Sequence, residues 1–313
     1  MFYSTTSAEA KRENLRSRLG REEPLVLFGA FNALTALMIQ RNGGEGVYLS
    51  GHMIAADLGL PDLGLTTVTE VAMRSQQVSR MIDIPLMVDA DTGFGEPLNM
   101  ARSIQTLEDA GVAACHVEDQ VNPKQCGHSE GIKVVERDAA VQRVAAAVAA
   151  RRDPNFVIIA RTDARAAIGL DEAIRRGKSY RDAGADVIFA EALRGEKEYE
   201  RFMREVGAPI MVNLNEFGSG TPLSREELRN IGVSVAVYPM TLMRLALGAV
   251  ERGIQIVMDK GSQAPLVSQM QTKDELYSYL GYSDYKIFDD AVFSSSEASG
   301  SDAGLSESPR QDD

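Results

Sequence analysis

Polar residues that could bind a metal ion or a polar substrate follow a series of short apolar segments in this sequence. They are Ser50-Gly51, Asp89-Ala90-Asp91, Glu118-Asp119, Arg161-Thr162-Asp163, Glu191, Asn213 and Asn215-Glu216. Any one of these groups could simply begin a helix, where Ser, Asp and Asn are common as capping residues. A whole series at successive segment ends favours a shared polar site instead.

The carboxylates of this series predict a divalent cation. Asp89 and Asp91 end one segment, and Glu118 and Glu191 end later ones. Crowded carboxylates repel one another and raise their pKa values unless a cation neutralises them. Oxygen ligands with room for water suit Mg²⁺, or Mn²⁺ as an alternative. Asp91 could instead cap the following turn.

A cysteine and an arginine add reactive and charged groups. Cys126 lies in the sequence Lys124-Gln125-Cys126-Gly127-His128, where the basic neighbours would assist ionisation of its thiol. Arg161 ends an apolar segment and could hold a substrate carboxylate. The alternatives are a passive loop thiol for Cys126 and an internal ion pair from Arg161 to Glu191 or Asp163. His52 could border the site or cap a loop.

Short apolar runs alternate with longer amphipathic segments, which is typical of parallel strands joined by helices. The predicted strands are Val26–Ala30, Gly46–Ser50, Pro85–Ala90, Ala114–Val117, Phe156–Arg161, Asp186–Ala190, Pro209–Asn213 and Val235–Tyr238. The clearest helical segments are Asn99–Ala110, Glu136–Arg151, Leu170–Ala183 and Arg225–Asn230. Eight such strands predict an α/β fold, a closed (β/α)₈ TIM-type barrel, with an open doubly wound sheet as the competing fold.

Two further segments follow the barrel region. Thr241 to Phe293 is predicted to form a helical arm at the carboxyl end, so the barrel domain with its helices would span residues 1–293. Residues 294–313 are rich in Ser, Gly, Asp and Glu. Because few apolar groups remain there to offset the entropy of ordering, we expect a disordered tail.

Composition excludes several classes of protein. The chain has 313 residues and a formal net charge of −12, with no block of basic residues, which disfavours nucleic acid and anionic membranes as partners. No apolar run is long enough for a membrane span, and the first residues lack the apolar core of a signal peptide. Cys115 and Cys126 are too few for a disulfide framework. A cytoplasmic location is expected.

Several blocks of sequence, in a fixed order, carry a resemblance to a known family. They are YLSG from Tyr48, LGLPDLG from Leu58, VDADTGFGE from Val88, EDQVNPKQCGH from Glu118, ARTDA from Ala160 and the N-x-N-E-F-G block from Asn213. With these blocks the chain resembles the isocitrate lyase/phosphoenolpyruvate mutase superfamily, and within it the 2-methylisocitrate lyase family. The resemblance covers roughly residues 8 to 293.

The resemblance implies a role for each matching residue. Asp89, Asp91 and Glu118 would hold Mg²⁺, largely through water. Tyr48 would remove the proton of the substrate hydroxyl, and Cys126 would protonate the departing carbanion. The other implied site residues are His128 at the catalytic centre and Ser50, Gly51, Asp62, Gly127, Arg161, Glu191, Asn213 and Asn215 around the substrate. The chain departs from the family pattern at His52, Gln125 and Asn215, which bears on substrate identity more than on reaction type.

The predicted function is therefore a Mg²⁺-dependent carbon–carbon lyase for a small hydroxy-carboxylate. The first hypothesis is cleavage of 2-methylisocitrate to pyruvate and succinate in propionate catabolism. Alternatives are a lyase for another 2-hydroxy dicarboxylate such as dimethylmalate, a carboxyphosphonoenolpyruvate phosphonomutase, and a non-catalytic barrel. The resemblance also implies a homotetramer that exchanges carboxyl-terminal helices.

Overall fold

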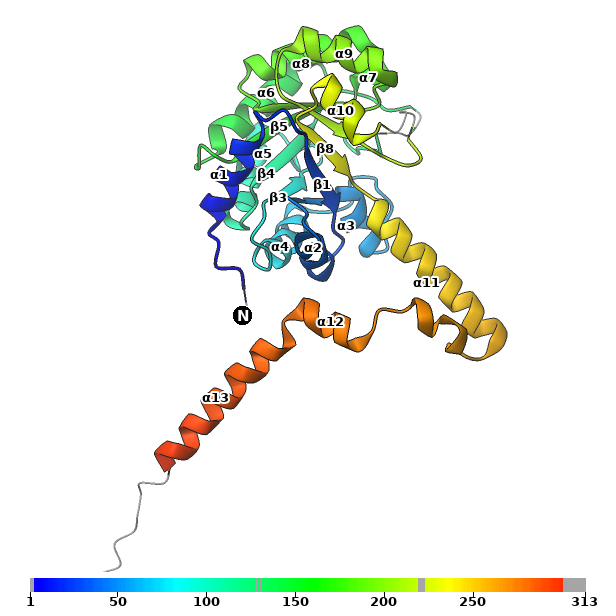
Figure 1. The fold of residues 1–313 in the computed structure, drawn as a ribbon. Coiled ribbons are helices and arrows are strands. Elements are labelled where there is room, and N and C mark those ends of the chain that lie inside the picture. Colours follow the sequence, from blue (N-terminus) through cyan, green and yellow to red (C-terminus); the bar gives the residue numbers. More distant parts are fainter. Residues whose placement is uncertain (1–2, 128, 130, 219–222, 301–313) are drawn as a thin grey trace, which may run out of the picture. The chain divides into compact units, whose positions relative to one another are not determined.

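The strands close into a single parallel barrel (Figure 1). A computed structural model describes residues 3–127, 129, 131–218 and 223–300. The strands are β1 (Leu25–Gly29), β2 (Val47–Leu49), β3 (Leu86–Asp89), β4 (Ala114–Glu118), β5 (Val157–Thr162), β6 (Val187–Ala190), β7 (Ile210–Asn213) and β8 (Val235–Tyr238). Each pairs with the next in sequence, and β8 pairs with β1 from Leu25↔Val235 to Phe28↔Tyr238. The predicted barrel is confirmed, with every strand end within one residue of its expected place.

Helices follow the strands and surround the barrel (Figure 1). Those of the barrel region are α1 (Ala8–Arg18), α2 (Ala33–Arg41), α3 (Gly51–Asp57), α4 (Val68–Ser79), α5 (Pro97–Asp109), α6 (Arg137–Ala150), α7 (Ala164–Ala167), α8 (Leu170–Asp182), α9 (Gly195–Val206), α10 (Arg225–Ile231) and α11 (Thr241–Lys260). Their ends follow local chemistry: Thr67 and Glu70 form a capping box at the start of α4, and Gly232 ends α10 with a φ of +88°.

Side-chain alternation along each strand separates the barrel interior from the surrounding layer. Leu25, Met87, Ile159 and Phe189 pack together in one buried apolar cluster, while the alternate residues of the strands pack in two other clusters with residues of the surrounding helices. Because successive strand residues point to opposite faces, the next inward position after each apolar residue lies nearer the carboxyl end of its strand. After Met87, Ile159 and Phe189 the next inward residues are polar, namely Asp89, Arg161 and Glu191.

Helix α1 was not predicted from the sequence, and it packs against the barrel. Leu15 and Leu19 join the apolar cluster of the barrel interior. On the same buried face Lys11 Nζ donates to the carbonyl of Ser79 at 2.8 Å, and Arg12 Nε donates to the carbonyl of Val112 at 3.0 Å. The helix is polar in sequence, yet its cationic side chains can be buried because they donate to backbone oxygens at the ends of other segments.

Residues from Leu266 onward form a compact unit separate from residues 3–265. This second unit contains most of the short helix η1 (Ala264–Gln269), together with α12 (Lys273–Leu280) and α13 (Tyr282–Gly300). A helical arm was expected, and α13 continues seven residues into the segment predicted to be disordered. Residues 301–313 of that segment lie outside the described residues. None of the described helices has the length and apolar character needed to cross a lipid bilayer.

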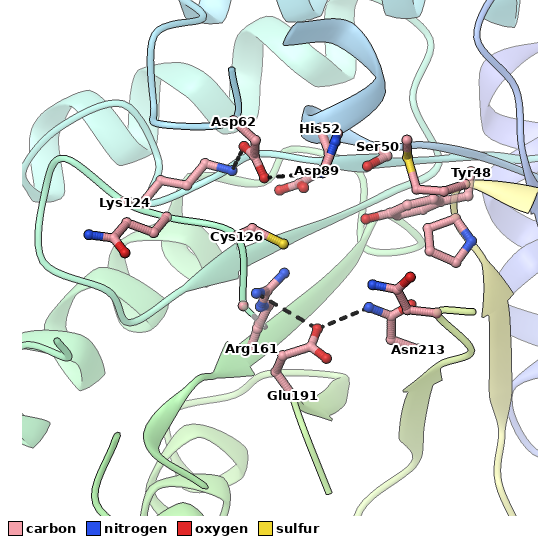
Figure 2. A pocket seen from close by; sticks show the side chains of 15 residues that line it. Tyr48, Ser50, His52, Asp62, Asp89, Lys124, Cys126, Arg161, Glu191 and Asn213 are labelled. Atoms are coloured by element: carbon pink, nitrogen blue, oxygen red, sulfur yellow. Dashed lines mark hydrogen bonds and ion pairs between the residues drawn. The ribbon is translucent and has the colours of Figure 1, made fainter. Parts of the chain in front are cut away.

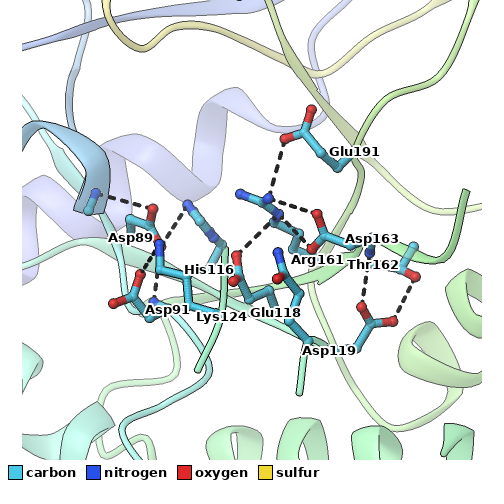
Figure 3. A network of polar contacts seen from close by, with 12 residues as sticks. Asp89, Asp91, His116, Glu118, Asp119, Lys124, Arg161, Thr162, Asp163 and Glu191 are labelled. Atoms are coloured by element: carbon cyan, nitrogen blue, oxygen red, sulfur yellow. Dashed lines mark hydrogen bonds and ion pairs between the residues drawn. The ribbon is translucent and has the colours of Figure 1, made fainter. Parts of the chain in front are cut away.

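Asp119, which follows β4, accepts hydrogen bonds from β5 and α8 in a buried polar network, and Figure 3 shows its contacts with Thr162 and Asp163. Its carboxylate accepts from Tyr180 Oη at 2.7 Å, from Thr162 Oγ1 at 2.7 Å and from the backbone N–H of Asp163 at 2.9 Å. The Arg176 guanidinium lies 3.0 Å from the same carboxylate. Asp119 is the acceptor that these four groups share, and Arg176 has a second acidic partner in Glu172 at 3.1 Å.

Asp119→Ala is expected to lower the free energy of unfolding by about 2–4 kcal/mol, because the buried hydroxyls of Tyr180 and Thr162 lose their acceptor, at about 1–3 kcal/mol for each unsatisfied group. Arg176 keeps its ion pair with Glu172 in this variant. Urea denaturation of the purified chain measures the change. The control is Asp182→Ala, which removes an exposed ion pair to Arg181 and should cost under about 1 kcal/mol. Equal destabilisation by the two variants would contradict a special role for the network.

Candidate active site

Polar side chains from successive strands meet at one end of the barrel (Figure 2). Along the interior face of each strand every second residue points inward, so Asp89 is the next inward residue after Met87. In the same way Arg161 comes after Ile159 and Glu191 after Phe189. A cavity of about 50 Å³ opens among them. Its walls are Tyr48, Ser50, His52, Asp62, Asp89, Lys124, Gln125, Cys126, Gly127, Arg161, Glu191, Asn213, Asn215, Pro239 and Met240.

Most of the residues expected from the sequence line this cavity, and Gly51, Asp91 and Glu118 lie beside it. Gly51 donates its backbone N–H to Asp89 Oδ2 at 3.1 Å. Asp91 Oδ1 lies 2.7 Å from the cavity residue Lys124, and Glu118 Oε2 lies 3.3 Å from Arg161 Nε. The prediction for His128 falls outside the described residues. The structure thus gathers the predicted side chains in one place, while their individual roles stay predictions.

Lys124 bridges two carboxylates at one side of the cavity. Its Nζ lies 2.5 Å from Asp62 Oδ1 and 2.7 Å from Asp91 Oδ1. Burial, followed by the neighbouring charge of Asp89, raises the pKa of Asp91 to about 6. The surrounding carboxylates outweigh burial and raise the pKa of Lys124. The ammonium of Lys124 therefore partly neutralises the negative charge of the surrounding carboxylates.

Arg161 is surrounded by acidic side chains on the opposite side (Figure 3). Its Nη2 lies 2.8 Å from Asp163 Oδ1 and 3.7 Å from Glu191 Oε2. Asn213 Nδ2 donates to the same Glu191 oxygen at 3.1 Å. The internal ion pair left open by the sequence is therefore present. The guanidinium still lines the cavity, where it could also meet a substrate carboxylate.

Tyr48 and His116 form a buried pair beneath the cavity. The Tyr48 hydroxyl lies 2.8 Å from His116 Nε2, and that nitrogen lies 3.6 Å from Asp89 Oδ1. Burial, with a smaller contribution from Asp89, raises the pKa of Tyr48. Burial lowers the pKa of His116 to about 4. Both rings are consequently neutral near pH 7, and a proton can pass along their hydrogen bond.

The loop after β4 carries Cys126 and Gly127 to the cavity. The Gln125 backbone N–H donates to Gln120 Oε1 at 2.9 Å, and Gln120 Nε2 donates back to the Gln125 carbonyl at 2.9 Å. A Cβ atom on Gly127 would collide with Arg161 and Glu191. Only glycine allows the backbone to approach these charged side chains so closely.

Comparison with known proteins assigns the chain to a family. The family model described as phosphoenolpyruvate phosphomutase matches residues 15–258. The chain belongs to this family. A protein of Corynebacterium glutamicum named probable 2-methylisocitrate lyase 2 is 50% identical over 293 residues, which cover 94% of this chain and 95% of that protein. The 2-methylisocitrate lyase of Escherichia coli is 40% identical, over 90% and 96% of the two chains.

Solved structures of the phosphoenolpyruvate mutase/isocitrate lyase superfamily share the fold. Oxaloacetate acetylhydrolase in complex with 3,3-difluorooxalacetate superimposes with a TM-score of 0.85 at 29% identity, over 91% of this chain and 97% of that one. For 2,3-dimethylmalate lyase the TM-score is 0.81 at 29% identity, over 97% and 100%. Phosphonopyruvate hydrolase, solved in complex with oxalate and Mg²⁺, gives 0.81 at 26% identity, over 88% and 97%.

The residues of this phosphoenolpyruvate mutase family member fit a hard divalent ion. A Cβ atom on Gly51 would lie 2.9 Å from Asp91 Oδ1 and 3.0 Å from Asp89 Oδ2, so both carboxylates turn toward the space that a side chain would fill. The two buried oxygens of Glu118 accept no hydrogen bond from any residue that the structure describes. Oxygen donors alone, some of them unsatisfied, are what Mg²⁺ requires of a protein.

Gly51→Ala is expected to weaken Mg²⁺ binding by about 10- to 100-fold, because the new methyl group displaces the carboxylates that face it. Isothermal titration with Mg²⁺ measures the loss. Gly20→Ala is the matched control, since a Cβ there meets nothing within 4 Å. Unchanged affinity in Gly51→Ala would argue against this position for the ion.

Lys124 and His116 were not among the predicted site residues. Lys124 was noted only as a basic neighbour of Cys126, yet it contacts Asp62 and Asp91. The signal that could have identified His116 is strand alternation, because it lies two residues before Glu118 and on the same face. A histidine at an inward position of a buried strand has few partners except other site residues.

Proposed function

We propose that this protein is a carbon–carbon lyase that cleaves 2-methylisocitrate to pyruvate and succinate with a bound Mg²⁺ ion. The identity of 50% to a probable 2-methylisocitrate lyase across nearly the whole chain supports the substrate. The observation that carries the chemistry is one small cavity that holds Tyr48, Asp89, Cys126 and Arg161 together. These supply a proton acceptor, a metal ligand, an acid and a cation for a carboxylate.

Tyr48 begins the reaction by accepting the proton of the substrate hydroxyl. Because the pKa of Tyr48 is raised, its phenol is protonated and must hand on its own proton as it accepts another. His116 Nε2, at 2.8 Å, is positioned to take that proton. Asp89, at 3.6 Å, then offsets the charge of the imidazolium. The electrons of the hydroxyl oxygen form the carbonyl of pyruvate as the adjacent C–C bond breaks.

Cys126 completes the reaction by protonating the other fragment. The electron pair of the broken bond remains on the carbon of the succinate fragment, and the thiol gives that carbon a proton. The resulting thiolate regains its proton before the next turnover, so the proton taken by His116 and the proton given by Cys126 balance. Arg161 holds a substrate carboxylate during these steps.

Asp89, Asp91 and Glu118 would hold the Mg²⁺ ion in this scheme. A divalent ion at this place lowers the energy of a developing alkoxide and orients the hydroxy acid. The solved complex of phosphonopyruvate hydrolase with Mg²⁺ supports the choice of metal, with Mn²⁺ as an alternative ion of similar ligand preference.

The purified chain, supplied with Mg²⁺ and 2-methylisocitrate, is expected to release pyruvate and succinate in equal amounts. Pyruvate is followed with lactate dehydrogenase and NADH, and succinate by chromatography. A second candidate substrate is a 2,3-dimethylmalate-type dicarboxylate, because the dimethylmalate lyase fold matches and His52, Gln125 and Asn215 line the cavity. A panel of hydroxy acids ranks the candidates by kcat/KM. Absence of any 2-oxo acid from the whole panel would exclude the lyase proposal.

We further propose a cytoplasmic homotetramer that acts in propionate catabolism. Helix α11 presents exposed apolar side chains, with Leu245 66%, Ile254 59% and Met258 79% exposed, and Ile287 of α13 is 67% exposed. Exposed apolar helix faces favour burial between subunits. Exchange of carboxyl-terminal helices between copies would provide that burial, and analytical ultracentrifugation of the full chain tests the tetramer.

A further inference from the structure

A second set of donor atoms lies at the cavity, distinct from the all-oxygen set of Asp89, Asp91 and Glu118. His52, Asp62 and Cys126 each offer one ligand atom, and these atoms all lie within 4.8 Å of one another. His52 belongs to the first turn of α3, Asp62 to the loop after that helix and Cys126 to the loop after β4 (Figure 2). All three side chains line the same cavity.

The donor atoms of this set select a different ion from Mg²⁺. An imidazole nitrogen, a carboxylate oxygen and a thiolate sulfur together suit Zn²⁺ and similar thiophilic ions, whereas Mg²⁺ prefers oxygen alone. A tetrahedral zinc ion with three protein ligands keeps its fourth position for water or another small ligand. We propose that these three residues bind a thiophilic divalent ion and that the bound ion blocks the cavity.

The two oxygens of Asp62 make the site compatible with the existing contacts. Oδ1 accepts from Lys124 Nζ at 2.5 Å, while Oδ2 faces His52 Nδ1 at 3.7 Å. An ion between His52 and Asp62 therefore replaces a long contact and leaves the short one to Lys124 in place. The His52 side chain is 38% exposed, so its ring can rotate toward the ion without disturbing the barrel core.

Occupation of the site inhibits the reaction proposed above. An ion held by His52, Asp62 and Cys126 would occupy one wall of the cavity in which the substrate is proposed to bind. The ion also takes the sulfur of Cys126, the group proposed as the acid. This inhibitory effect rests on the proposed function, whereas the binding of the ion does not.

Binding is tested on the full chain in Mg²⁺-containing buffer, independently of activity. Zn²⁺ affinity is measured by competition with a chromogenic chelator, and Co²⁺ replaces Zn²⁺ for spectroscopy because a cobalt–thiolate bond adds a charge-transfer band in the near ultraviolet. The native chain should bind one Zn²⁺ and develop the Co²⁺ band. His52→Ala should weaken Zn²⁺ binding about tenfold or more, and Cys126→Ser should also abolish the band.

Cys115→Ala serves as the matched control, because it removes the other thiol, which lies buried in β4. This variant should bind Zn²⁺ as the native chain does and keep the cobalt band. Equal Zn²⁺ affinity in the native chain and His52→Ala, or a native cobalt complex without the sulfur band, would overturn the proposed site. Binding without inhibition of pyruvate release would retain the site and overturn only its blocking effect.

Discussion

Cys126→Ser is expected to lower kcat by about 10²- to 10⁴-fold, which is the usual contribution of a positioned acid or base. A serine hydroxyl is a far weaker acid than a thiol, so it cannot protonate the carbanion in time. The cavity wall changes by one atom, and substrate affinity should therefore remain near its native value. Steady-state release of pyruvate measures kcat, and isothermal titration with 2-methylisocitrate measures binding.

The two cysteines of the chain provide the control for this experiment. Cys115 is fully buried in the apolar layer between β4 and its helices, and Cys115→Ala should keep native kcat. If Cys126→Ser turns over substrate at a near-native rate, the thiol is not the acid. Loss of activity in both variants would instead indicate general damage to the barrel, which circular dichroism detects.

Removal of the divalent ion is expected to reduce turnover by about a thousandfold or more, since a metal ion supplies several kcal/mol of stabilisation to a developing alkoxide. EDTA treatment followed by gel filtration gives the ion-free chain, and added Mg²⁺ or Mn²⁺ should restore pyruvate release. In the Asp89→Asn variant, added Mg²⁺ or Mn²⁺ should not restore pyruvate release. Full activity of the ion-free chain would contradict the proposed metal requirement.

The pH dependence of metal binding provides a further measurement for the same prediction. The pKa of Asp91 is raised to about 6 in the ion-free chain, mainly by burial. Below that pH the carboxyl holds a proton that Mg²⁺ must displace, so affinity should fall as the pH decreases from 7 to 5. Above it, Asp91 is ionised and affinity should level off. Isothermal titration across this range measures the effect, and Asp91→Asn should flatten it.

Much of the fold could be predicted because the apolar strand runs are short, β-branched and separated by helix-stop residues. The positions of Asp89, Arg161 and Glu191 followed from the same pattern, since parallel strands in a barrel end at one rim. Helix α1 could not be predicted in this way. Its buried Lys11 and Arg12 donate hydrogen bonds to backbone carbonyls of distant segments. Such contacts cannot be recognised from the local spacing of apolar residues.

The site was less predictable where long-range partners decide the role of a side chain. Lys124 looked like a neighbour that assists Cys126, but the loop directs its ammonium to Asp62 and Asp91. His116 looked like part of an apolar strand, but it lies 2.8 Å from the Tyr48 hydroxyl. Sequence spacing gives the face of a strand on which a residue lies, and it cannot give the neighbour contributed by another strand.

The crowding of carboxylates around Lys124 and Arg161 has a consequence for the order in which ligands bind. The two cations are outnumbered by the acidic groups that contact them, among them Asp91, Glu118 and Asp163. A multiply charged anion arriving at the ion-free cavity would meet net repulsion. If the proposed function holds, a metal ion bound first would reduce this repulsion, and the kinetics should follow a compulsory sequence with the metal ion before the organic acid rather than random addition.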